Sequence, residues 1–168
     1  MYIAGQIVGI LVTVTVIIIQ QLKSRKQILW ASVFVNVLGA LNVLLLDGFG
    51  SGVTVNFVAI LQILIALRHE NKNTEESVIE KIIFFVLYVG VGVISYTSPL
   101  DILAILAAVF YMVAMLQKKE QHIRLCLLAN MTSWTIYHGI LGSTGIFAQL
   151  AGIVSAVIAL YRYRKKTD

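Results

Sequence analysis

The chain alternates long apolar stretches with short polar ones along its whole length. No lysine or arginine occurs in residues 1–22, 27–67, 82–117 or 125–161. A helix needs about 20 apolar residues to cross the hydrocarbon core of a bilayer. The first of these stretches therefore has room for one crossing, and each later stretch has room for two. This pattern predicts an all-α membrane protein with seven transmembrane helices.

Turn residues divide the longer apolar stretches into single helices. Asp47–Gly52, Ser98–Asp101 and Gly142–Gly145 are turns by composition, and Pro99 suits the first turn of a helix. The polar stretch 68–81 is the largest loop, with room for a short interfacial helix near residues 75–81. The expected helices cover about residues 3–21, 28–46, 53–67, 82–97, 100–116, 125–141 and 146–161.

The charges give the expected helices a direction. The chain has 13 Lys and Arg, and seven alternating crossings place all of them on one side of the membrane. Cytoplasmic loops collect Lys and Arg, so we expect an outer N-terminus and an inner C-terminus. Only 12% of the residues are charged, against about 25% in soluble domains. The net charge of +5 therefore suits an anionic lipid surface, and we expect no nucleic-acid partner.

The first three expected helices have the same layout as the last three. In each set an apolar helix, a basic turn, a second helix, a glycine-rich turn and a third helix follow in order. The two sets are offset by about 94 residues, so that Asn36 falls opposite Asn130 and Arg68 falls opposite Arg162. This predicts two parallel three-helix repeats, 1–69 and 99–168, joined by a linker helix within 70–98. Alternatively, the chain contains no true repeat, because any seven-helix protein with short loops can be divided into three, one and three helices.

This 3+1+3 plan resembles the SWEET and SemiSWEET sugar transporters and the wider PQ-loop group. The opening Gln6-Ile-Val-Gly9, the segment Gln20–Lys26 and the series Asn36, Asn42, Gly48 resemble the YgjV-type family of bacterial inner membrane proteins. The second resemblance covers nearly the whole chain and implies a multi-pass protein of the inner membrane. SWEET-like proteins carry helix prolines linked to their rocking motion, whereas Pro99 is the only proline here. The resemblance therefore implies the fold more than the gating mechanism.

Polar side chains inside the expected helices are the candidate binding site, because such groups need a partner or a wet cavity. Asn130, Trp134 and Tyr137 share one face of the sixth helix, with His138 beside them. Amides suit the hydroxyls of a sugar, and an indole suits its apolar face. By the resemblance, Asn56 and Gln149 are nearest to the asparagines that bind sugar in SWEET-like proteins. The complete predicted site is Asn36, Asn42, Asn56, Asn130, Trp134, Tyr137, His138 and Gln149.

Two classes of function remain open from these residues. In the first, the protein is a transporter that carries a small polar, sugar-like solute by facilitated diffusion between the repeats. In the second, the polar residues only bond neighbouring helices, and the protein binds a partner subunit or lipid. His138 is either a proton-linked switch or a neutral, hydrogen-bonded side chain. We expect no enzyme activity, metal or cofactor, because the sequence shows no nucleophile, phosphate-binding or metal-binding motif. Cys126 is expected to be a small core residue.

Overall fold

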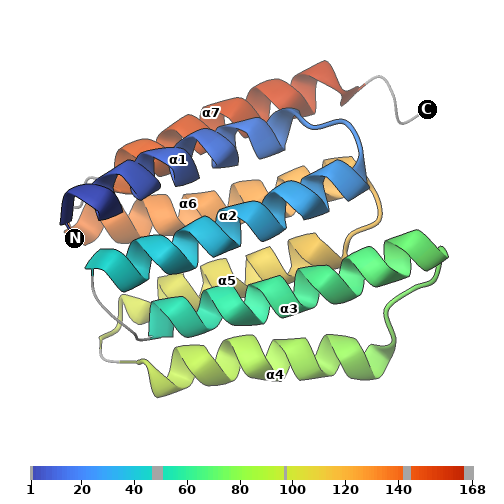
Figure 1. Cartoon of the computed structure of the whole chain (residues 1–168), viewed down its shortest axis with the longest axis horizontal. Coiled ribbons are helices and arrows are strands. Elements are labelled where there is room, and N and C mark those ends of the chain that lie inside the picture. Colours follow the sequence, from blue (N-terminus) through green and yellow to red (C-terminus); the bar gives the residue numbers. More distant parts are fainter. Residues whose placement is uncertain (1, 47–50, 97, 142–144, 165–168) are drawn as a thin grey trace.

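The computed structural model describes residues 2–46, 51–96, 98–141 and 145–164. Within them the chain forms seven α-helices and no strand, which confirms the all-helical prediction (Figure 1). The helices are α1 (Tyr2–Gln21), α2 (Arg25–Leu46), α3 (Ser51–Lys72), α4 (Val78–Ile94), α5 (Asp101–Leu116), α6 (Glu120–Leu141) and α7 (Gly145–Arg162).

Several helices extend beyond the apolar segments that predicted them. The helix α3 continues to Lys72, past the expected end near residue 67, so the predicted boundary after residue 69 falls inside it. The helices α2 and α6 likewise begin within polar sequence, at Arg25 and Glu120. Apolar residues mark only the part of a helix that hydrocarbon would cover, whereas backbone hydrogen bonds continue into the polar interface.

The stretch between α3 and α4 is a connection with defined caps at both ends. Asn73 adopts a left-handed conformation (φ 51°), and Thr74 N–H donates to the His69 carbonyl, which ends α3 in a Schellman motif. At the start of α4, the Ser77 hydroxyl accepts from Glu80 N–H, and the Glu80 carboxylate accepts from Ser77 N–H. This capping box begins α4 directly, so these residues form no separate interfacial helix.

The helices form a closed ring with one helix outside it. Successive helices pack against each other within α1–α3, called the first unit, and within α5–α7, called the second unit. Contacts of α7 with α1 and of α3 with α5 join the two units into the ring. The helix α4 packs against α5 and α3 at one edge of the molecule (Figure 1). The helix α4 therefore lies beside the ring, and its residues Tyr88, Val91 and Gly92 line a cavity between α4 and the ring.

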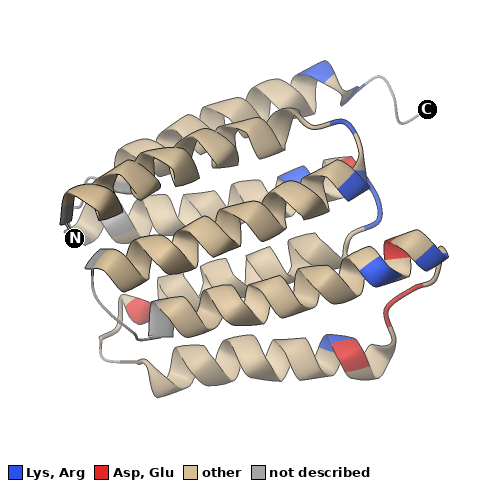
Figure 2. Cartoon of the chain, in the orientation of Figure 1, with Lys and Arg blue, Asp and Glu red and all other residues tan. Residues whose placement is uncertain are grey.

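The two ends of the ring differ in charge and in packing. All described Lys and Arg residues gather toward one end, the basic end (Figure 2). The helix α5, whose first residue is Asp101, begins at the opposite end (Figure 1). The largest apolar core is in the basic half, where its members come from the first turns of α2 and α6 and the later turns of the other ring helices. This core includes Ile19, Ile28, Leu29, Ile63, Leu67, Met115 and Ile123.

The outer surface of the ring is apolar. Large hydrophobic side chains such as Ile3, Leu11, Trp30, Phe34 and Phe147 are exposed on it. Among the described residues, three helical segments are long and apolar enough to cross a membrane, namely Ile3–Gln21, Arg25–Leu45 and Val53–Lys72. Asp101–Leu116 and Ile146–Arg162 are shorter apolar helices. This surface is that of a membrane protein, and the number of crossings remains a prediction.

Candidate functional site

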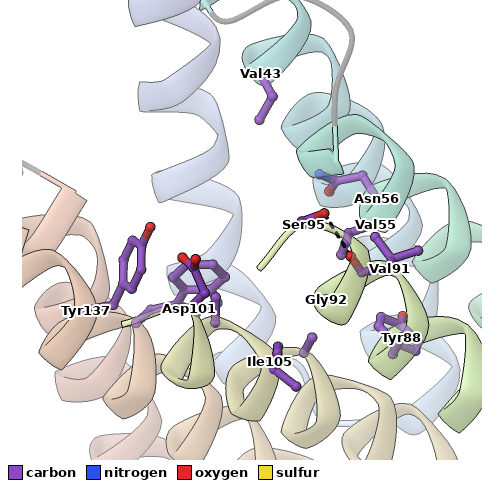
Figure 3. A pocket seen from close by; sticks show the side chains of 13 residues that line it. Val43, Val55, Asn56, Tyr88, Val91, Gly92, Ser95, Asp101, Ile105 and Tyr137 are labelled. Carbon is purple, nitrogen blue, oxygen red and sulfur yellow. Dashed lines mark hydrogen bonds between the residues drawn. The ribbon is translucent and has the colours of Figure 1, made fainter. Parts of the chain in front are cut away.

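Two cavities lie inside the molecule and share the side chain of Trp134. The end cavity, of about 350 Å³, lies toward the end opposite the basic one, among α2, α3, α4, α5 and α6 (Figure 3). The central cavity, of about 130 Å³, lies among α1, α2, α5, α6 and α7. Because Trp134 lines both, the two cavities adjoin at its side chain.

The central cavity is lined by both units and contains a buried acceptor atom without a partner. The Gln20 side chain is only 2% exposed, and its Oε1 accepts no hydrogen bond within the described part of the chain. Other polar groups on the wall come from Ser32, Tyr111, Asn130 and Gln149. Buried polar atoms are nearly always hydrogen-bonded in folded proteins, so this acceptor is a suitable partner for a bound donor.

The end cavity combines mostly apolar walls with a few polar groups. The Tyr88 hydroxyl is buried and has no hydrogen-bond partner among the described atoms. The Asp101 carboxylate lines this cavity and accepts from Ser98 N–H at 2.7 Å. The rings of Trp134 and Tyr137 pack edge to face, with 5.4 Å between their centroids. Figure 3 shows the side chains of Asp101 and Tyr137 on one side of the space and those of Asn56 and Tyr88 on the other.

The structure divides the predicted site residues into two groups. Asn130, Trp134 and Gln149 line the central cavity, and Asn56, Trp134 and Tyr137 line the end cavity. These five residues come from α3, α6 and α7, so the fold brings distant parts of the chain together around the two cavities. The side chain of His138 lies outside the described part of the structure.

The remaining two, Asn36 and Asn42, line neither cavity. The Asn42 amide donates to the Gly5 carbonyl of α1 at 2.7 Å. The Asn36 amide donates to the Ser32 carbonyl at 2.6 Å and to the Tyr111 hydroxyl at 2.5 Å. Tyr111 belongs to the second unit, so Asn36 links the two units across the ring. Both asparagines therefore have the hydrogen bonds expected of residues that join helices.

The sequence interpretation missed several residues of the cavity walls. Gln20 falls near the end of the expected helix 3–21, and nothing in the sequence distinguishes it from Gln21 and Lys23, which follow it. Tyr88 and Tyr111 gave no signal, since tyrosines inside apolar helices are common core residues. Asp101 was expected where an outer turn meets the helix at about residues 100–116, and it is the first residue of α5, but its position on a cavity wall was not predicted.

Two arginines at the basic end are buried, whereas the sequence analysis used their charges only to predict the direction of the chain. Arg25, at the start of α2, is 3% exposed and forms ion pairs with Glu70 and Glu76. Its guanidinium also donates to the carbonyls of Met115 at 3.2 Å and Gln117 at 2.6 Å. Those carbonyls end α5, where a cation is favoured by the helix dipole.

Arg124, near the start of α6, makes the reciprocal contact. It is 2% exposed and donates to the carbonyls of Gln20, at 3.1 Å, and Leu22 at the end of α1. Its guanidinium also lies 4.8 Å from the ring centroid of Tyr163. Each arginine thus reaches from the middle helix of one unit to the end of the first helix of the other. We call Arg25, Arg124 and these four carbonyls the arginine clasp.

One protein family matches almost the entire chain. The family described as Imp-YgjV, bacterial inner membrane protein, matches residues 3–167. No curated protein and no solved structure matches the chain. The apolar outer surface agrees with the family description. The chain therefore belongs to the Imp-YgjV family of bacterial inner membrane proteins.

Proposed function

We propose that the protein is a transporter through which a small polar solute crosses the inner membrane by facilitated diffusion between the first and second units. The observation that carries the proposal is Gln20 Oε1, a buried acceptor without a partner on the wall of the central cavity. Leaving such a group unpaired costs about 1–3 kcal/mol. A solute that donates a hydrogen bond would relieve this cost during passage.

The two cavities and the clasp support a path with one open and one closed end. The solute would enter the end cavity, pass Trp134 and reach the central cavity. The packed core and the arginine clasp stand between the central cavity and the basic end. Passage would then require the clasp to open. Among the described residues, Asp101 is the only acidic side chain that lines either cavity, which favours facilitated diffusion over strong ion coupling.

The proposed arrangement in the membrane has seven crossings with the basic end in the cytoplasm. The positive-inside rule supports this direction. The two units would be parallel repeats joined by α4, a plan in which the site lies between repeats. The clasp supports the repeat, because its carbonyls in the first unit, Gln20 and Leu22, lie 95 residues before those in the second unit, Met115 and Gln117, and this spacing is within one residue of the offset between Asn36 and Asn130.

Solute flux into proteoliposomes tests the proposal. The purified protein should give saturable uptake of at least one solute in a panel of sugars, amino acids and small amines. Trp134→Ala should reduce that uptake about tenfold or more, since the indole lines both cavities. Trp30→Ala is the matched control, because Trp30 is 54% exposed on the outer surface. Flux that is absent throughout, or equal in both variants, would contradict the proposal.

The second candidate is a non-transporting membrane protein that binds a partner subunit or lipid. One observation favours it, since the amides of Asn42, Gln62 and Asn130 all donate to backbone carbonyls of neighbouring helices. Such bonds stabilise helix packing by about 0.6–2 kcal/mol each and need no solute. Under this alternative, the walls of the central cavity would stay inaccessible to polar reagents.

A further inference from the structure

We propose that a groove on the outer surface between α1 and α7 binds one anionic phospholipid of the cytoplasmic leaflet. The phosphate of this lipid would contact Arg162, and one of its acyl chains would lie along the groove. The inference concerns the surface that faces lipid, so it is independent of whether a solute passes between the two units. It rests on the proposed placement of the basic end at the cytoplasmic face of the membrane.

The two junctions between the units differ in what covers them. The junction of α3 with α5 is covered by α4, which packs against both helices. The junction of α1 with α7 lies at the opposite edge of the molecule, away from α4 (Figure 1). A groove of about 400 Å³ is found there, lined among others by Ile17 of α1 and by Val154 and Ile158 of α7. Because Val154 is 58% and Ile158 is 47% exposed, the groove opens to the lipid-facing surface.

The groove ends at a cation that has no acidic partner in the part of the chain described by the structure. Arg162 lines the groove and is exposed, and none of the salt bridges found includes it. The helices α1 and α7 contain no Asp or Glu. A guanidinium carries five N–H donors in a planar fork that matches the oxygens of a phosphate. An anionic headgroup therefore complements this end of the groove.

Hydrogen bonds in the floor of the groove hold the guanidinium in position. Arg162 donates to Oε1 of Gln21 at 3.2 Å. Nε2 of Gln21 donates to Oγ of Ser155 at 2.8 Å, and the Tyr163 hydroxyl donates to the Gln21 carbonyl at 3.1 Å. Oγ of Ser155 in turn donates to the Ile17 carbonyl at 2.9 Å. These bonds fix Gln21, so the cationic site is formed before a lipid binds, which lowers the cost of binding.

The length of the groove matches the thickness of one leaflet. Ala151 and Arg162, which both line it, are separated along α7 by about 16 Å. Half of the hydrocarbon core of a bilayer is about 15 Å thick. Tyr161, next to Arg162, is 83% exposed, and tyrosines collect at the membrane interface. The guanidinium would thus lie at headgroup level, and the groove would follow an acyl chain to about the midplane.

Native mass spectrometry of the purified full-length protein tests the choice of lipid. The protein, in a neutral detergent, is mixed with equal amounts of phosphatidylglycerol and phosphatidylcholine that carry the same acyl chains. It should retain one phosphatidylglycerol in preference to phosphatidylcholine by about fivefold or more, because only the first has a net negative charge. Equal retention would overturn the inference. Displacement of the lipid by excess inorganic phosphate would show a simple anion site and would also overturn it.

Neutralising Arg162 locates the headgroup. Arg162→Gln should weaken the retention of phosphatidylglycerol about fivefold and leave that of phosphatidylcholine unchanged. Arg68→Gln is the matched control, because Arg68 is the sequence counterpart of Arg162, is exposed at the basic end and lies outside the groove. Equal losses in the two variants would reduce the effect to the general charge of the basic end and overturn the site.

Filling the groove tests the position of the acyl chain without changing any charge. Ile158→Trp should abolish the preference for phosphatidylglycerol, because the indole occupies the space of the chain. Val157→Trp is the control and should keep the preference, since Val157 is 52% exposed on the same helix but does not line the groove. An unchanged preference in Ile158→Trp would overturn the assignment of the groove.

Solute flux separates this inference from the proposed function. Retention of phosphatidylglycerol without flux of any solute would refute the transporter and keep the lipid site. Saturable flux without any preference between the two lipids would refute the lipid site and keep the transporter.

Discussion

Two neighbouring residues, Arg25 and Lys26, show how differently two basic side chains of one cluster can act. Both belong to the same basic turn of the sequence. Lys26 is exposed, whereas Arg25 is 3% exposed and holds two carboxylates and two carbonyls. Arginine suits this position because its planar guanidinium donates in several fixed directions at once. Both charges favour the cytoplasmic side of the membrane for this turn, and Arg25 in addition joins the two units.

Replacing Arg25 should therefore destabilise the fold strongly. Arg25→Ala removes the partner of Glu70 and of the buried Glu76 and leaves the last carbonyls of α5 uncapped. Breaking a buried ion pair in this way costs about 3–5 kcal/mol. Denaturant unfolding in detergent micelles measures the change in free energy.

Lys26→Ala is the matched control for that experiment. It removes one positive charge from the adjacent, exposed position and should change the free energy of unfolding by less than about 0.5 kcal/mol. Similar stabilities for the two variants would show that the clasp does not hold the units together.

At the level of single residues, the sequence predicted part of the candidate site. Asn130, Trp134 and Tyr137 could be found because one helical face carried an amide and two aromatic rings. Asn36 and Asn42 were indistinguishable from them, since an amide that lines a cavity and one that bonds a neighbouring helix look alike in a single sequence. Gln20 and Arg124 depended on which helices meet across the ring, and no local pattern contains that information.

At the scale of single elements, α4 carries two glycines in contrasting surroundings. A Cβ atom on Gly92 would lie 2.6 Å from Cγ1 of Ile105 on α5, whereas one on Gly90 would meet no atom within 4 Å. The missing side chain of Gly92 therefore permits the close approach of α4 to α5 beside the end cavity. Gly90 faces no neighbouring helix and has no such role.

Alanine at these two positions should have opposite effects. Gly92→Ala must push Ile105 or the whole of α4 away, at a cost of about 1–3 kcal/mol. Gly90→Ala should be neutral or stabilise the helix by up to about 1 kcal/mol, because alanine is the better helix former. Thermal unfolding of both variants in the same detergent gives the comparison. Equal destabilisation would mean that α4 does not pack on α5 as described.

The start of α4 should make stability sensitive to acid. Hydrogen bonds from the Ser77 backbone and from His69 hold the pKa of the Glu80 carboxyl below its usual value of 4.5. A lowered folded-state pKa stabilises the protein above the unfolded pKa, and the stabilisation is lost as the pH falls through the folded value. The capping box should therefore weaken below about pH 4.5.

The variant Glu80→Gln tests this dependence. Glutamine can still accept from Ser77 N–H but does not titrate, so the melting temperature of this variant should fall less between about pH 5 and pH 3 than that of the wild type. The exposed Glu75→Gln is the control and should keep the wild-type slope. If the melting temperature falls equally with pH in all three proteins, Glu80 does not cause the acid sensitivity.

The elements themselves were the most predictable part of the fold. The gaps between basic residues predicted seven helices, and seven are found in the described residues. Their ends were less predictable, because α3 and α6 continue through charged residues that hydropathy assigns to loops. The capping box of Ser77 and Glu80 was present in the sequence and would have located the start of α4.

At the scale of the whole molecule, the ring is packed at one end and hollow toward the other. The large apolar core and the arginine clasp occupy the basic half, whereas the larger cavity lies near Asp101. The closure of the ring through α1 with α7 and α3 with α5 could not be derived from the sequence. Such contacts depend on side-chain fit between distant helices, and the weak residue identity of the two units gave little guidance.

The central claim is that a polar space lies between the two units, and cysteine accessibility tests it most directly. In a Cys126→Ala background, Asn130→Cys places a thiol on the central cavity wall, and Thr132→Cys places one on the exposed outer face of the same helix. A small, charged thiol reagent applied to the protein in liposomes should label position 130 and leave position 132, facing lipid, unlabelled. An unreactive position 130 alongside a reactive thiol outside the bilayer, such as Lys118→Cys, would contradict the account.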